Sequence, residues 1–194
     1  MKTIEAFSHP YPAKLLLFGE YTVLSDLLRM SLMVSDTCAT RVIARESGLS
    51  REDFHAAMNR KALALGMTHT RYVETTGLDE RNVSTAADIA RVLEVAAKNP
   101  LIHEITTTQK YEVATAKRSH FIGNTNRLLY SDYEIVGGKT GFINEAGYCF
   151  ATWIRTQGRD LIAVVLGAPT NATRFADVVR LIQRTAPASF APAE

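Results

Sequence analysis

The sequence has little of what marks an exported, membrane-spanning or nucleic-acid-binding protein. Its apolar stretch near the N-terminus, Leu15–Phe18, is followed at once by Gly19 and Glu20. Signal peptides and membrane helices need longer apolar runs, so we expect neither, and the sequence as given carries no export signal. The net charge is +2, and the longest basic cluster is residues 117–120. An extended surface for nucleic acid or anionic lipid is therefore not predicted.

Cysteine is scarce and metal-binding motifs are absent. Cys38 and Cys149 are far apart and show no CxxC or Cys/His spacing, which gives no sign of a zinc site or a disulfide framework. We expect two buried thiols. The five histidines show neither H-E-x-x-H nor a paired ligand spacing, so no metal and no cofactor are predicted. With 194 residues, 46% of them hydrophobic, the chain can bury a real core. A small-ligand protein is favoured.

The first half of the chain predicts helices. Residues 50–66 begin with Ser50 and Asp53, which have the spacing of a capping box, and continue with an apolar stripe. Residues 84–100 repeat this design and end at a break at Asn99-Pro100. Two shorter helices, residues 25–33 and 36–46, are expected to meet around Ser35 and Asp36. The turn-forming residues between 68 and 82 predict a loop.

The second half changes to a strand pattern. Residues 148–156 and 160–168 are rich in β-forming residues, and Gly158 lies in the short connection that predicts a hairpin. A strand that ends at residues 135–141 precedes them, which predicts a three-stranded antiparallel meander. A closing helix is expected from Asn171, and the tail is expected to fray.

Lys139 lies in this first strand, between Gly137-Gly138 and Thr140-Gly141. Glycines have no Cβ, so a ligand could approach the backbone closely and pair with it as an added strand. Lys139 and Thr140 would then offer a cation and a hydroxyl to a carboxylate. The alternative is a surface lysine beside a flexible turn, and these residues alone favour that alternative.

Four segments favour a functional role for Lys139 over the surface-lysine alternative: residues 34–40, 66–92, 124–126 and 137–149. They count because they occur in one chain and in the order that one family shows. Together they resemble the serine-type D-alanyl-D-alanine carboxypeptidases, which are low-molecular-mass penicillin-binding proteins. The resemblance extends from about Asp26 to Gln183. It implies an α+β fold of the β-lactamase/transpeptidase type, with an antiparallel sheet, packed helices and a helical lobe.

The N-terminal residues resemble a different family. Pro12–Leu24 is similar to the opening strands of the galactokinase, homoserine kinase and mevalonate kinase superfamily, although nothing in the chain corresponds to the phosphate-binding loop of those kinases. We therefore expect an N-terminally truncated or recombined chain, such as a chimera, in which this strand covers the edge of the strand at 160–168. The expected divisions are a foreign segment, a helical lobe, a sheet lobe and a flexible tail, at residues 1–25, 26–105, 106–186 and 187–194.

The resemblance also implies roles for individual residues. The superfamily combines a serine nucleophile in S-x-x-K with the motifs S-D-N and K-T-G. By resemblance, Ser35 and Lys139 are catalytic, with Ser35 as a proton relay, while Thr37, Lys139, Thr140 and Gly141 bind the substrate. Thr37 stands where the motif has asparagine, and a hydroxyl cannot replace an amide's carbonyl and two N–H donors.

The nucleophile itself is not found, because no serine is followed three residues later by lysine. Thr107 and Lys110 have T-x-x-K spacing, and Tyr11 and Lys14 have a similar spacing, but neither pair is assigned a role. Three interpretations stay open. The chain is a D-Ala-D-Ala carboxypeptidase by lineage, inactive without its nucleophile; a non-catalytic module that binds a peptidoglycan stem peptide or a β-lactam; or an engineered chimera without native function.

The resemblance implies a periplasmic or other extracytoplasmic location, with the cytosol as the alternative if no signal is present. Neither nucleic acid nor a transmembrane segment is expected as part of the function. The oligomeric state is left open.

Overall fold

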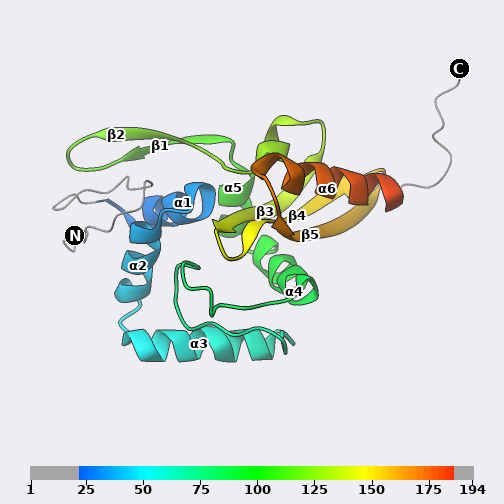
Figure 1. The fold of residues 1–194 in the computed structure, drawn as a ribbon. Coiled ribbons are helices and arrows are strands. Elements are labelled where there is room, and N and C mark those ends of the chain that lie inside the picture. The colour runs from blue at the N-terminus through cyan, green and yellow to red at the C-terminus, as the bar shows by residue number, and fades with distance from the viewer. Residues whose placement is uncertain (1–21, 186–194) are drawn as a thin grey trace, which may run out of the picture.

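The computed structural model describes residues 22–185 and shows a three-stranded sheet beside a group of helices (Figure 1). The elements in chain order are α1 (Leu24–Val34), α2 (Thr37–Glu46), α3 (Arg51–Ala64), α4 (Ala86–Ala97), α5 (Pro100–Thr107), β1 (Lys110–Ala114), β2 (Ser119–Gly123), the 3-10 helix η1 (Arg127–Tyr130), β3 (Glu134–Ile143), β4 (Gly147–Thr156), β5 (Arg159–Ala168) and α6 (Asn171–Thr185). The predicted α+β class is confirmed.

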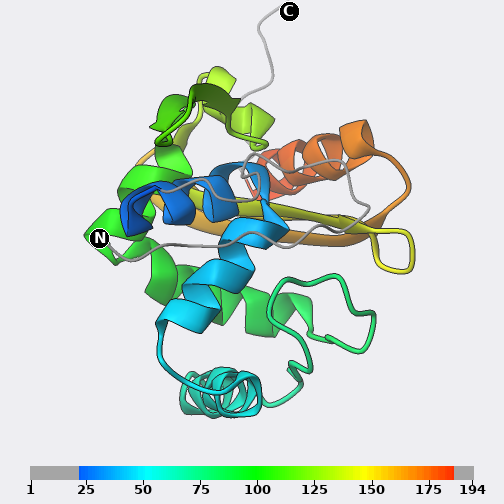
Figure 2. The ribbon, with the colours of Figure 1, turned by 90° about the vertical axis from the view of Figure 1, so that its left-hand side faces the viewer.

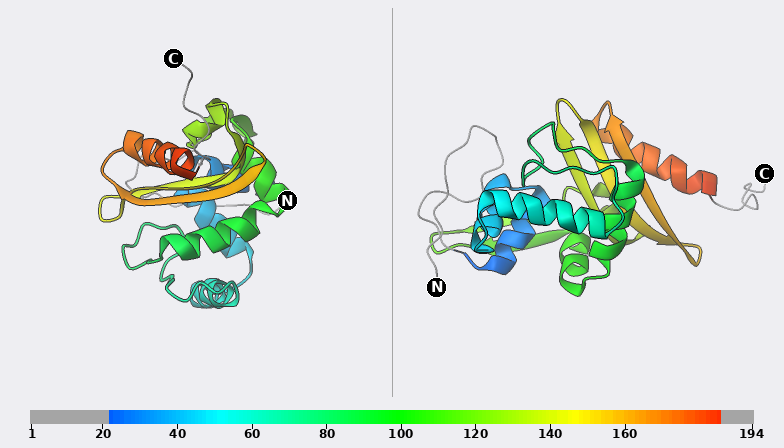
Figure 3. Two further views of the ribbon diagram at one scale, coloured as in Figure 1. Left: turned by 90° about the vertical axis from the view of Figure 1, so that its right-hand side faces the viewer. Right: turned by 90° about the horizontal axis from the view of Figure 1, so that it is seen from below.

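The sheet has the order β3-β4-β5 and is antiparallel throughout, as the strand pattern predicted. Helix α6 covers one face and α4 the other (Figure 3). The core between the sheet and α6 contains Phe150 and Ile154 from β4 and Phe175 and Val178 from α6. Phe150 and Phe175 contact each other with ring centroids 4.9 Å apart, so aromatic packing joins the sheet to α6.

A second core joins α1, α2, α5 and the β1–β2 hairpin. Leu27, Met30 and Met33 of α1 pack with Ile105 of α5 and Val113 of β1. Figure 2 shows α2 leading from α1 down to α3. Because α1 is anchored in this core and α5 also contacts β3, the end of α1 is held close to the sheet.

The four predicted helices of the first half are confirmed, and so is the closing helix. Ser50 accepts a hydrogen bond from the Asp53 amide, and Thr85 accepts one from the Asp88 amide, so both predicted N-caps are present.

Helix α5, the pairing of β1 with β2 and the 3-10 helix η1 were not predicted. The break at Asn99-Pro100 ends α4 but also begins α5, where Asn99 caps the helix and Pro100 occupies its first turn. The β1–β2 hairpin occupies a region that the resemblance assigned to a connection.

The expected N-terminal strand lies almost entirely outside the described residues. The boundary expected at residue 25 falls inside α1, which begins at Leu24. Among residues 22–185, β5 pairs only with β4. No helix in this part of the chain is long and apolar enough to cross a membrane.

Candidate functional site

Two residues that are 104 positions apart in the sequence meet at the junction of the helices and the sheet. Ser35 follows the last residue of α1, and Lys139 lies in the middle of β3. The Lys139 ammonium donates a hydrogen bond to Ser35 Oγ and a second one to its neighbour's carbonyl, Thr140 O, at 2.8 Å. The structure therefore brings together the two residues that the motifs singled out.

Ser35 has an unusual backbone conformation. Its φ of 59° and ψ of 38° lie in the left-handed region, which costs a residue with a Cβ on the order of 1 kcal/mol. The Asp36 amide closes α1 by donating to Met30 O at 3.0 Å. The left-handed turn lets α2 start directly after α1 and leaves Ser35 exposed beside Lys139.

The other two residues of the S-D-T motif occupy the start of α2. Asp36 is fully buried, and its Oδ1 accepts a hydrogen bond from the Ala39 amide at 2.8 Å. It is therefore the N-cap of α2, a structural role that fixes the helix next to Ser35. Thr37 is the first residue of α2 and is half-buried.

The environment of Lys139 disfavours its charge. The pKa of the ammonium is lowered from 10.5 to about 8, mainly by burial and in addition by the nearby Arg174 guanidinium. Arg174 belongs to α6 and is itself buried. Two cations close together in a partly desolvated place favour the arrival of an anion.

Arg174 was missed by the sequence analysis. Its guanidinium donates to Gly141 O at 3.0 Å and to Cys149 O at 3.3 Å, and so connects α6 to β3 and β4. A signal was available, because Arg174 precedes Val178 by four residues and therefore lies on the apolar stripe of the predicted helix. A charged residue on such a stripe indicates a buried partner.

The Thr140 hydroxyl is already engaged. Thr140 Oγ1 and Thr125 Oγ1 are 2.6 Å apart, and Thr125 Oγ1 also donates to Met33 O at 3.1 Å. Since the single Thr125 proton goes to Met33 O, Thr140 must donate its own proton to Thr125. In this arrangement the Thr140 oxygen can accept a hydrogen bond, and Lys139 is the side chain of the K-T-G motif that can donate to a ligand.

The N-T-N segment, residues 124–126, forms the turn that holds Thr125 in place. Asn124 Nδ2 donates to Thr108 O at 3.0 Å, and its Oδ1 accepts from the Asn126 amide at 3.0 Å. Asn126 Oδ1 in turn accepts from the Leu128 amide. These bonds connect the segment to the end of α5, and Thr125 connects it to both α1 and β3.

The glycines of β3 serve packing rather than ligand approach at two of the three positions. A Cβ on Gly138 would lie 2.9 Å from Ala151 O, and a Cβ on Gly137 would lie 3.0 Å from the Ala97 Cβ. A Cβ on Gly141 would lie 3.7 Å from the Cys149 Cβ, which is an ordinary contact. Gly137 and Gly138 are thus required by the neighbouring strand and by α4.

The remaining candidates do not join the site. Thr107 is the last residue of α5 and donates to His103 O at 2.7 Å, while Lys110 begins β1, so the T-x-x-K pair does not lie on one helix. Cys38 is buried and Cys149 is half-buried. Within the described residues, no group of three His, Cys, Asp or Glu side chains could hold a metal ion.

The D-alanyl-D-alanine carboxypeptidase family matches residues 10–170 of the chain, which include most of the segment expected to be foreign. The D-alanyl-D-alanine endopeptidase of Pseudomonas aeruginosa is 40% identical over 159 residues, which cover 80% of this chain and 51% of the relative. The Escherichia coli D-alanyl-D-alanine endopeptidase is 38% identical over 160 residues, with the same coverage. The chain thus spans about half the length of these curated relatives.

Solved structures of penicillin-binding proteins and DD-transpeptidases have a similar fold. The Streptomyces K15 DD-transpeptidase superposes with a TM-score of 0.82 at 26% identity, covering 87% of this chain and 70% of that one. Penicillin-binding protein D2 of Listeria monocytogenes, in a cefotaxime-bound form, has a TM-score of 0.73 at 33% identity, covering 82% and 65%. The β-lactamase/transpeptidase-like fold is confirmed. Sequence and structure together show that this chain belongs to the D-alanyl-D-alanine carboxypeptidase family.

Proposed function

We propose that this chain holds the carboxylate-binding part of a D-Ala-D-Ala peptidase site and accepts a peptide that ends in D-Ala-D-Ala, or a β-lactam. The observation that carries the proposal is the hydrogen bond from Lys139 to Ser35, which joins the K-T-G strand to the S-D-T corner. An ammonium in a partly desolvated place, with Arg174 nearby, has a strong electrostatic preference for a carboxylate.

Strand β3 also suits an extended peptide. Within residues 22–185 it pairs with β4 along one edge only. A peptide that adds to the other edge near Lys139 would gain main-chain hydrogen bonds, while Lys139 binds its terminal carboxylate. In this arrangement Thr37 and Gly141 contact the substrate, and Thr140 accepts a hydrogen bond from it.

In a complete enzyme of this family, Ser35 would pass a proton between the nucleophile and the leaving group. This chain has no S-x-x-K, so we propose that on its own it binds ligand reversibly and does not carry out acyl transfer. Removing a nucleophile that acts together with its base eliminates most of the chemical acceleration. The family relationship supports peptidoglycan stem peptides as the natural ligands, and a location outside the cytoplasmic membrane.

The alternative function is acyl transfer through another hydroxyl group of the chain. Reaction with a fluorescent penicillin distinguishes this activity from reversible binding. The protein is incubated with the penicillin and then analysed by denaturing gel and mass spectrometry. We expect no covalent adduct. A stoichiometric acyl adduct would show that the chain has a nucleophile, and peptide mapping would identify it.

Reversible binding is measured in a second experiment. Calorimetric titration with N-acetyl-D-Ala-D-Ala and with its C-terminal amide measures the contribution of the carboxylate. We expect the acid to bind about 10-fold to 100-fold more tightly than the amide, the range for a hydrogen bond to a charged group. In Lys139→Ala this preference should be lost. Equal affinity for acid and amide in the wild-type protein would overturn the carboxylate role.

A further inference from the structure

The turn at residues 124–126 contacts both sides of the Ser35–Lys139 site, although it contains neither residue. Its central residue, Thr125, is 92 positions from Met33 and 15 positions from Thr140 in the sequence, and it contacts both. Neither the S-D-T motif nor the K-T-G motif includes Thr125. Its contacts nevertheless indicate a role in the site, because each of them lies next to Ser35 or Lys139 in the sequence.

On the helix side, Thr125 holds the last turn of α1. Met33 is the last residue but one of this helix and precedes Ser35 by two positions. Its carbonyl oxygen accepts a hydrogen bond from the Thr125 amide at 3.0 Å and another from the Thr125 hydroxyl at 3.1 Å. The last carbonyls of a helix have no partner within the helix, so donors from another segment fix the place where the helix ends. The position of Ser35 therefore depends on Thr125.

On the strand side, the turn contacts β3 before and after Lys139. Thr140 follows Lys139 and is buried, and its hydroxyl oxygen lies 2.6 Å from the hydroxyl oxygen of Thr125. Gly138 precedes Lys139, and a Cβ on Gly138 would lie 3.2 Å from Asn126 Nδ2. Since both neighbours of Lys139 are in contact with the turn, the turn fixes the strand at this point.

The turn is itself held by the segment that joins α5 to β1. The Asn124 amide donates to Gln109 O at 2.8 Å, and the Asn124 side chain donates to Thr108 O at 3.0 Å. Asn124 Oδ1 accepts from the Asn126 amide at 3.0 Å, which closes the turn around Thr125. These contacts give Thr125 a fixed position between α1 and β3.

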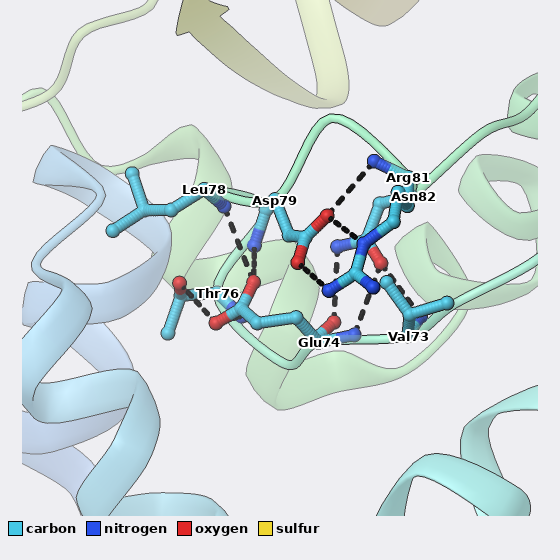
Figure 4. Close-up of polar contacts among 8 residues, drawn as sticks. Val73, Glu74, Thr76, Leu78, Asp79, Arg81 and Asn82 are labelled. Carbon is cyan, nitrogen blue, oxygen red and sulfur yellow. Dashed lines mark hydrogen bonds and ion pairs between the residues drawn. The ribbon is translucent and has the colours of Figure 1, made fainter.

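A second polar network, in the loop at residues 73–82, shows the contrast (Figure 4). The Glu74 carboxylate accepts from the amides of Thr76 at 2.7 Å and Gly77 at 2.8 Å, and Asn82 Oδ1 accepts from the Val73 amide at 2.7 Å. These bonds stay within the loop, which lines a hollow of about 820 Å³ together with α2 and the start of α3. That network shapes one loop, whereas the contacts of Thr125 join two elements that are far apart in the sequence.

We propose that Thr125 is a positioning residue of the candidate site, which holds β3 against the end of α1 and so keeps Lys139 in contact with Ser35. The consequence for binding rests on the proposed function, because it takes Lys139 as the cation that receives a carboxylate. Without the Thr125 hydroxyl, α1 and β3 lose its bond to Met33 O and its contact with Thr140, and only the bond from the Thr125 amide remains. Lys139 is then less well fixed and more accessible to water.

Two substitutions separate the hydroxyl of Thr125 from the shape of its side chain. Thr125→Val keeps the size and removes the hydroxyl, while Thr125→Ser keeps the hydroxyl and removes a methyl group. The matched control is Thr152→Val. Thr152 is buried in β4 and donates to Gly137 O of β3 at 3.1 Å, so this control removes a buried hydroxyl that joins the same strand to β4 and not to α1.

Each variant is measured in two ways. Calorimetry with N-acetyl-D-Ala-D-Ala and its C-terminal amide gives the preference for the acid. NMR titration of protein labelled with ¹³C at the lysine Cε gives the pKa of Lys139 without any ligand, and Lys139→Ala identifies its signal. Burial is the main cause of the lowered pKa of Lys139, about 8, so a lysine that moves into water has a pKa closer to 10.5.

We expect Thr125→Val to lower the preference for the acid about 3-fold to 10-fold, the size of one hydrogen bond. The pKa of Lys139 should rise from about 8 towards 10.5 in the same variant. Thr125→Ser and Thr152→Val should keep both the preference and the pKa of the wild-type protein.

A Thr125→Val protein that keeps the wild-type pKa of Lys139 would overturn the positioning role. The same rise of this pKa in Thr152→Val or in Thr125→Ser would overturn it too, because the effect would then not depend on the Thr125 hydroxyl. If the wild-type protein binds acid and amide equally, while Thr125→Val alone raises the pKa of Lys139, the proposed function is overturned and the positioning role stands.

Discussion

At the scale of single residues, the site depends on the protonation of the Lys139 amine. Burial and Arg174 disfavour the ammonium, and Ser35 and Thr140 O accept its hydrogen bonds. The motif pattern was enough to single out Ser35 and Lys139, which the structure brings into contact, and their catalytic roles stay a prediction. It was not enough to predict that the Thr140 proton is committed to Thr125, because this depends on a contact between β3 and a turn 15 residues earlier.

The lowered pKa of Lys139 predicts how binding depends on pH. Because the pKa is about 8 instead of 10.5, the cation is present below pH 8 and is lost as the pH rises through that value. Affinity for N-acetyl-D-Ala-D-Ala should not change with pH below about pH 7. Above about pH 8, where Lys139 of the ligand-free protein loses its proton, the affinity should fall by up to about 10-fold per pH unit.

Calorimetric titrations at several pH values, with the amide ligand as control, measure this dependence. A bound carboxylate raises the pKa of the ammonium, so the decline should be accompanied by proton uptake on binding. Affinity that stays constant up to pH 10 would contradict the assignment of Lys139 as the binding cation.

At the scale of secondary-structure elements, the sequence predicted what is local. Caps and apolar periodicity identified α3 and α4, two shorter helices were expected where α1 and α2 lie, and the strand pattern identified the meander. Helix α5 was missed because a proline that ends one helix can also begin the next. The Gly137-Gly138 pair was interpreted as an approach for ligand, whereas the structure shows contacts with Ala97 and Ala151, which only the tertiary fold determines.

This difference between the glycines predicts different tolerance to substitution. Gly138→Ala places a Cβ 2.9 Å from the backbone oxygen of Ala151, which cannot easily move, so the free energy of unfolding should fall by about 1–3 kcal/mol. Gly141→Ala meets only an ordinary contact and should change stability by less than about 0.5 kcal/mol.

Denaturant unfolding followed by the fluorescence of Trp153, the single tryptophan of the chain, measures both variants. Equal stability of the two variants would show that the close approach at Gly138 is not a constraint on the folded protein.

At the scale of the whole molecule, the central result is the contact between Ser35, at the junction of α1 and α2, and Lys139 in β3. The expected α+β fold could be predicted from the order of four segments, and the family and the solved structures confirm it. The hollow between α2, the start of α3 and the loop at residues 73–81 could not be predicted from the sequence. The relative positions of these three segments depend on the complete fold. The chain spans about half the length of its curated relatives.

The most direct test of this contact is a double-mutant cycle on Ser35 and Lys139, with affinity for N-acetyl-D-Ala-D-Ala measured by NMR titration, which detects weak binding. If the two residues form one site, Ser35→Ala should weaken binding several-fold in the wild-type background and should have no further effect in Lys139→Ala. An equal loss of affinity from Ser35→Ala in both backgrounds would contradict the account.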